Sequence, residues 1–136
     1  MAEFEIGQTF LDLKATNFYG EKGKYFIALS SAEYDDDPIA CFVMNTENRM
    51  DKYHIDCNRG DQKFILAPNK FPFIKNHTSI MLSQPVQYSL REIYEDNITL
   101  LDKADPLLCR QIKNCIDWSY ISPKFAELIN SSFKQL

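Results

Sequence analysis

A proline inside a strand-like stretch limits the folds open to this chain more than any other feature. The segment from Thr78 to Tyr88 has the apolar pattern of a buried β-strand, yet Pro85 follows Gln84 within it. Proline has no amide hydrogen to donate to a neighbouring strand, so this pair marks a sheet edge, a bulge or a barrel corner. We therefore expect a small, closed antiparallel β-barrel.

The first two thirds of the chain carry the pattern of short β-strands. Alternating or continuous apolar runs are separated by Gly, Pro, Asn and Asp, which is typical of an antiparallel barrel and not of a parallel sheet. The predicted strands cover residues 7–14, 24–30, 38–46, 53–57, 63–67 and 78–88, followed by a last short strand over 97–101.

The hydrophobic period changes from strand to helix near Leu90, where residues 90–93 can form one helical turn. Two helix starts follow, Asp105-Pro106 and Ser122-Pro123, each an N-cap residue with proline at the first helical position. They predict a helix over 105–119 that packs on the barrel and a short terminal helix over 122–133. The packing face of the first helix is predicted from residues at helical spacing: Leu108, Ile112, Cys115, Ile116 and Ser119. We expect a single domain over 1–136, with the barrel over 5–101.

The charge balance limits how this chain could contact nucleic acid. A formal net charge of −4 and a pI near 5.1 differ from the basic surface that a general nucleic-acid binder presents. Any RNA contact must therefore come from a local basic patch. The acidic run at residues 33–37 is read as a solvated turn between two strands.

The cysteines and the N-terminus bear on location and on metals. The N-terminus lacks the pattern of a secretory signal, and no apolar run is long enough to span a bilayer. We therefore expect a cytoplasmic protein with no membrane contact, in which the four cysteines are reduced. His54 and Cys57 have a spacing that zinc could use, but no second ligand pair follows at a usual interval. We expect neither a metal site nor a cofactor.

The order of these elements over residues 5–119 resembles the PemK/MazF family, SH3-like-barrel toxins of bacterial toxin–antitoxin systems. The segment GQTFLDL at 7–13 is similar to the family's first strand, and KYFIALS at 24–30 stands where the family has Arg-Pro followed by apolar residues and Leu-Ser. VMNT at 43–46 and LSQPV at 82–86 are similar to two further family strands. The resemblance implies a metal-independent endoribonuclease that acts on single-stranded RNA, forms a homodimer and is neutralised by an antitoxin protein.

The resemblance also assigns roles to two residues. Cleavage without a metal requires proton transfer from the 2′-hydroxyl and to the leaving 5′-oxygen, and a donor that offsets charge on the phosphorane. Lys24 stands at the family's phosphate-binding arginine, and keeps the charge without the planar bidentate fork. Thr46 is expected to contact the substrate or the leaving oxygen.

The family's acid/base pair is missing from this chain. Ser83 and Met81 stand where some members have an aspartate and an arginine, and neither side chain exchanges protons near neutral pH. Proton transfer would then fall to His54 or His77, because histidine is the residue type that titrates in this range. A surface cross-strand pair is the structural alternative for either histidine.

Other residues are expected to bind the RNA. The loop at 15–23 carries Phe18 and Tyr19 among lysines and glycines, and aromatic rings can stack on unpaired bases. The same two rings could instead cover the barrel end. The remaining predicted substrate contacts are Asn45, Ser83, Gln84 and Arg59, of which Arg59 lies in a polar segment that also reads as a simple β-turn.

Two other functions stay open. One is a catalytically inactive relative that binds RNA or a protein partner, which the missing acid/base pair and the acidic pI favour. The other is an unrelated SH3-like interaction domain.

Overall fold

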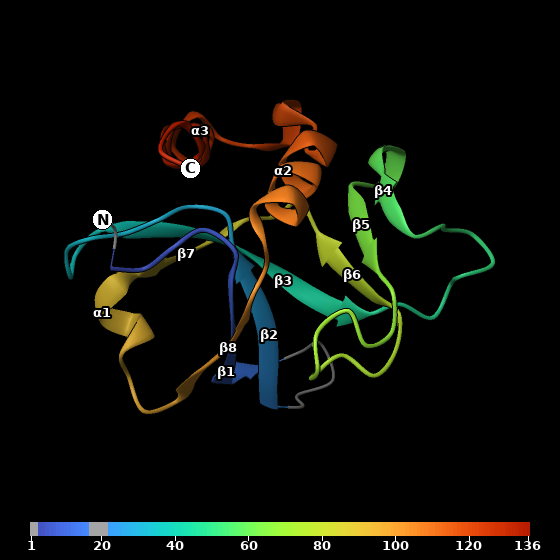
Figure 1. The fold of residues 1–136 in the computed structure, drawn as a ribbon, viewed down its shortest axis with the longest axis horizontal. Coiled ribbons are helices and arrows are strands. Elements are labelled where there is room, and N and C mark those ends of the chain that lie inside the picture. The colour runs from blue at the N-terminus through green and yellow to red at the C-terminus, as the bar shows by residue number, and fades with distance from the viewer. Residues whose placement is uncertain (1–2, 17–21) are drawn as a thin grey trace.

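The computed structural model describes residues 3–16 and 22–136. Within these residues the chain forms eight β-strands and three α-helices (Figure 1). The strands are β1 (Gln8–Thr16), β2 (Lys22–Ala28), β3 (Pro38–Thr46), β4 (Asp56–Asn58), β5 (Lys63–Leu66), β6 (Thr78–Met81), β7 (Val86–Ser89) and β8 (Ile98–Lys103). The helices are α1 (Leu90–Ile93), α2 (Pro106–Cys115) and α3 (Pro123–Lys134), with single 3₁₀ turns at Arg59–Asp61 and Trp118–Tyr120.

The strands form one antiparallel sheet in the order β4-β5-β6-β3-β2-β1-β8, and β7 pairs with β3 off this path. The prediction of a mainly antiparallel β fold with a C-terminal helix is therefore confirmed. Over residues 3–16 and 22–136, no strand pairing joins the two ends of the path, β4 and β8.

The Gln84-Pro85 pair interrupts the strand predicted over 78–88. The C-terminal half of β3 pairs with β6, where Met44 lies opposite Ile80, and its N-terminal half pairs with β7, where Cys41 lies opposite Val86. Five residues, 81–85, thus stand opposite only residues 42 and 43 of β3. The extra residues bulge out, and Pro85 lies outside the hydrogen-bond ladder. The bulge expected for this proline is therefore observed, and Pro85 also leads into β7, an edge strand that pairs, among the described residues, only with β3.

Apolar cores lie on both faces of the sheet. The larger core includes Ile27 and Phe42 and is covered by α2 and α3. The smaller core includes Phe10 and Ile39 and is covered by α1 through Leu90. We call these sides the α2 face and the α1 face. Because side chains alternate along a strand, each strand residue can be assigned to one of them.

Both predicted helix starts are confirmed, since the side chains of Asp105 and Ser122 accept backbone hydrogen bonds as N-caps. The predicted end of the first helix is wrong. Helix α2 stops at Cys115 because Ile116 takes an extended conformation. Ser119 therefore lies in a separate 3₁₀ turn, capped by Asp117, and not on the packing face of the helix.

A disulfide between Cys57 and Cys115 joins β4 to the end of α2, so the prediction of four reduced cysteines is wrong. Cys41 and Cys109 are free and buried. The disulfide also removes Cys57 as a zinc ligand beside His54. In the part of the chain that the structure describes, no three His, Cys, Asp or Glu residues are grouped to hold a metal ion, and no helix is long and apolar enough to cross a membrane.

Candidate functional site

Three adjacent strands bring several of the predicted site residues to one end of the sheet. Thr46 at the end of β3 lies opposite Thr78 at the start of β6, and the amide of Glu47 donates to the carbonyl of His77 at 2.8 Å. On the other side of β3, Tyr25 near the start of β2 lies opposite Met44. We call this end, formed by residues 24–25, 45–47 and 75–79, the rim.

The rim residues divide between the two faces of the sheet. Tyr25 and Thr46 lie on the α2 face, with Met44, and line one pocket there. Lys24 and Asn45 lie on the α1 face, because each is next to an α2-face residue along its strand. Lys24 and Thr46 therefore share the rim but lie on opposite faces of the sheet. They do not converge on one cleft.

The pocket on the α2 face has a volume of about 210 Å³. Its walls come from β2, β3, the start of β6 and the loop before β6, and its lining residues are Tyr25, Met44, Thr46, Phe73, Ile74, Lys75, Asn76 and Thr78. The ring of Phe73 stacks on Tyr25 with centroids 4.9 Å apart and on Phe71 with centroids 5.6 Å apart. The pocket thus combines an aromatic wall with hydroxyl, amide and ammonium groups.

On the α1 face, Lys24 lies opposite Asp12 of β1. Asp12 is only 7% exposed, and its carboxylate accepts hydrogen bonds from the Tyr88 hydroxyl at 2.6 Å and the Asn97 amide at 2.7 Å. Burial alone would raise the pKa of Asp12, but these bonds and that from the Lys14 amide outweigh it, so the pKa is lowered. Burial, and next the bond to Asp12, strongly raise the pKa of Tyr88, which stays protonated.

Sequence reasoning missed Asp12 and Tyr88. The available signal was the spacing of Phe10 and Asp12, which puts a carboxylate on the same strand face as a core phenylalanine. Such a residue needs partners within the fold, because an unpaired buried charge is costly.

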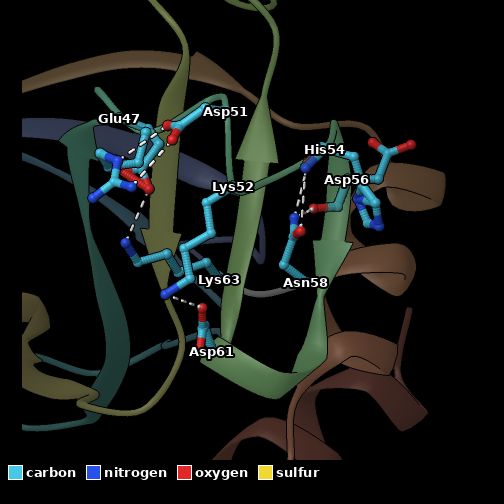
Figure 2. A network of polar contacts seen from close by, with 9 residues as sticks. Glu47, Asp51, Lys52, His54, Asp56, Asn58, Asp61 and Lys63 are labelled. Atoms are coloured by element: carbon cyan, nitrogen blue, oxygen red, sulfur yellow. Dashed lines mark hydrogen bonds and ion pairs between the residues drawn. The ribbon is translucent and has the colours of Figure 1, made fainter.

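An ion pair joins Glu47, the rim residue that follows β3, to Lys63 at the start of β5 (Figure 2). The Lys63 ammonium lies 2.9 Å from the Glu47 carboxylate and 4.5 Å from the ring centroid of Tyr53. The side chains of Lys63 and Glu47 are only 19% and 8% exposed. Burial would lower the pKa of Lys63, but the contacts with Glu47 and Tyr53 raise it. The negative charge of Glu47 is therefore already balanced by Lys63 within the protein.

Four predicted site residues lie away from the rim. Figure 2 shows His54 beside Asp56 and Asn58, apart from Glu47 and Lys63. His54 lies two residues before the outer strand β4, so the strand predicted over 53–57 is wrong at residues 53–55. Strand β4 is separated from β3 by β6 and β5, a lateral distance of about 14 Å at normal strand spacing. The Arg59 guanidinium donates to the carbonyl of Asn114 and so ties the 3₁₀ turn to α2.

Ser83 and Gln84 lie in the bulge between β6 and β7, opposite residues 42–43 of β3, roughly 10–13 Å along the strand direction from Thr46 at the usual rise per residue. Phe18 and Tyr19 fall outside the described residues. Of the predicted site residues, the rim collects Lys24, Asn45, Thr46 and His77.

Comparison of the chain with protein-family models, with curated proteins and with solved structures finds no match in any of the three.

Proposed function

We propose that the rim binds single-stranded RNA and that the protein cleaves it without a metal ion, as the resemblance to the PemK/MazF family implies. The observation that supports this most is the position of Lys24, Asn45, Thr46 and His77 near the same end of three adjacent strands, with Lys24 and Asn45 on the α1 face. Neighbouring strands lie about 4.8 Å apart, so a nucleotide or two would reach across the rim. Lys24 and Lys75 supply the local positive charge that an acidic protein needs to hold a phosphate backbone.

His77 removes the proton of the attacking 2′-hydroxyl in this proposal, and a water molecule protonates the leaving 5′-oxygen. The His77 side chain is half-exposed at the rim, and histidine is the residue type suited to exchange a proton with a 2′-hydroxyl or a leaving 5′-oxygen. Lys24 would offset charge on the phosphorane from the α1 face. Thr46, on the other face, would contact a neighbouring nucleotide and not the scissile phosphate.

We also propose that the sheet is an SH3-like barrel. The support is the antiparallel β1-β2-β3 meander, extended by β8 on one side and by β6, β5 and β4 on the other, with a bulge that lets β3 serve two partners. Both faces are covered by apolar residues. The homodimer and the antitoxin belong to the same proposal.

The two histidines allow a matched test. Single-stranded RNA is incubated with the protein in excess chelator, and the ends of the fragments are mapped. Cleavage should leave a 2′,3′-cyclic phosphate, and His77→Ala and Lys24→Ala should slow it roughly a hundredfold or more. His54→Ala, which changes the same residue type just before the outer strand β4, should cleave at the wild-type rate. RNA left intact by the wild-type protein would refute cleavage, and equal losses in both histidine variants would refute the role of His77.

The second candidate is a protein that binds RNA at the rim without cutting it. The separation of Lys24 and Thr46 onto opposite faces favours it, because the two residues cannot act on one phosphate. In that case Lys24→Ala would weaken RNA binding and reduce its salt dependence, while no cyclic phosphate forms. Growth of a bacterial host on expression gives a further distinction, since only the cleaving protein should arrest it.

A further inference from the structure

The pocket beside Thr46 has a composition suited to one particular part of an RNA chain. Its aromatic wall is a ladder of three rings in which Phe73 is nearly parallel to both neighbours, with interplanar angles of 20° to Tyr25 and 3° to Phe71. Phe71 is buried, whereas Tyr25 and Phe73 are half-buried and line the pocket. Phe73 is the middle ring and has a stacked neighbour on each side, so the surface left for a planar ligand is the outer face of Tyr25, with the edge of Phe73 beside it.

Polar groups surround this aromatic wall. The hydroxyl of Thr46 and the side chains of Lys75 and Asn76 are exposed at the pocket. The Thr78 hydroxyl is already used, since it donates to the Asn76 carbonyl at 2.9 Å. A hydroxyl and an amide beside an aromatic wall can both stack a base and hydrogen-bond its edge.

The volume suits a small group better than a whole drug-sized ligand. About 210 Å³ is below the range of roughly 300–1,000 Å³ that is typical of sites for drug-sized molecules. One planar ring system fits this space, while the attached sugar and phosphate would remain outside, near the ammonium groups of Lys75 and, across the rim, Lys24.

We propose that this pocket holds one unstacked base of the single-stranded RNA, stacked on Tyr25 beside the edge of Phe73 and read at its own edge by Thr46 and Asn76. The inference rests on the proposed RNA binding and adds a base-specific subsite to it. It also assigns a role to Thr46 that does not require this residue to reach the scissile phosphate.

The test uses short single-stranded RNAs that each carry one abasic nucleotide at a different position. Binding is measured by fluorescence anisotropy to His77→Ala protein, so that the RNA is not cut during the titration. Loss of one base, at one position, should weaken binding roughly ten- to a hundredfold, as expected for a stacked base. Abasic nucleotides elsewhere should change binding much less.

Two variants then locate the base. Phe73→Leu and Thr46→Val, each added to His77→Ala, should weaken binding of the intact RNA and reduce the abasic penalty at that position, because the two changes remove the same interaction. Thr99→Val, an exposed threonine on β8, is the matched control and should leave both values unchanged. Thr46 is exposed, so its variant tests the pocket even if Phe73→Leu impairs folding.

The outcomes separate the two proposals. If no RNA binds, or if Lys24→Ala has no effect on binding, the proposed function fails, and the base pocket with it. If RNA binds through Lys24 but no single base matters, or if the abasic penalty is undiminished in Thr46→Val and Phe73→Leu, only the base pocket is overturned.

Discussion

The disulfide between Cys57 and Cys115 should contribute a large share of the stability of this small domain. The two cysteines are separated by 58 residues, and closing a loop of this length removes about 14 cal/mol/K of entropy from the unfolded chain. The corresponding stabilisation is about 4 kcal/mol at 25 °C. This is a substantial part of the ~5–15 kcal/mol that holds a typical domain folded.

The native structure around the disulfide is held by other bonds as well. The Gln62 side chain donates to the carbonyl of Cys115 at 3.1 Å and accepts from the amide of Asp117 at 2.8 Å. We therefore expect β4, β5 and the end of α2 to keep their arrangement without the disulfide. Its loss should act mainly by giving the unfolded chain more freedom.

The assay compares the oxidised protein with Cys57→Ser/Cys115→Ser in chemical and thermal unfolding. The double variant should lose about 4 kcal/mol in the free energy of unfolding, which corresponds to a fall of about 15 °C in Tm for a chain of this length. Reductant should lower the wild type to the level of the variant and leave the variant unchanged. In denaturant, the oxidised protein should expose only the two free thiols, Cys41 and Cys109.

Two results would refute this reasoning. Equal unfolding midpoints for the double variant and the oxidised protein would show that the cross-link does not restrict the unfolded chain as calculated. Titration of all four cysteines in the denatured, unreduced protein would show that the disulfide does not form at all.

Three other substitutions test the fold. Gly7→Ala should destabilise by about 2–3 kcal/mol, because φ is +92° and the new Cβ would lie 2.7 Å from a backbone oxygen; Gly60→Ala, where nothing lies within 4 Å, should change the unfolding midpoint little. Tyr88→Phe removes a hydrogen bond to the Asp12 carboxylate and should cost about 1.5–3 kcal/mol at pH 7. The pKa of Asp12 is lower in the folded protein than in the unfolded chain. The stabilisation is therefore present above the unfolded pKa of about 3.9 and is lost as the pH falls below that value. If urea unfolding gave the same loss of stability for Tyr88→Phe at pH 7 and at pH 3, this reasoning would be contradicted. Asp105→Ala removes the N-cap of α2 and should lower the free energy of unfolding by about 1 kcal/mol. Loss of helical circular dichroism before the global transition would contradict this, because α2 would then unfold separately from the rest of the domain.

The features that the sequence predicted correctly depend on short stretches of chain. Asp105 and Ser122 cap helices because their side chains bond to amides three residues ahead, a contact that local sequence encodes. The interruption of the hydrogen-bond ladder at Pro85 follows from one missing amide hydrogen. The strand over 38–46 was predicted to the residue, since its apolar run is bounded by Pro38 and by polar residues after Thr46.

The errors concern contacts between distant segments. The pairing of Cys57 with Cys115 depends on where α2 packs against β4, and the spacing of cysteines along a chain does not encode that. Likewise, alternation shows that neighbouring residues of one strand face opposite ways. Alternation does not show which residues of β2 lie on the same face of the sheet as a given residue of β3.

The sequence by itself therefore determined the element types, the helix starts, the interruption of the ladder at Pro85 and the presence of Lys24, Thr46 and His77 near strand ends. Only the tertiary structure decided that these residues share one rim, that Lys24 and Thr46 lie on opposite faces, and that Tyr25 and Phe73 form a pocket wall beside Thr46. The physical reason is strand register. Capping and proline effects act within a few residues, whereas register is set by the packing of both sheet faces at once, and a shift of one residue would exchange the two faces.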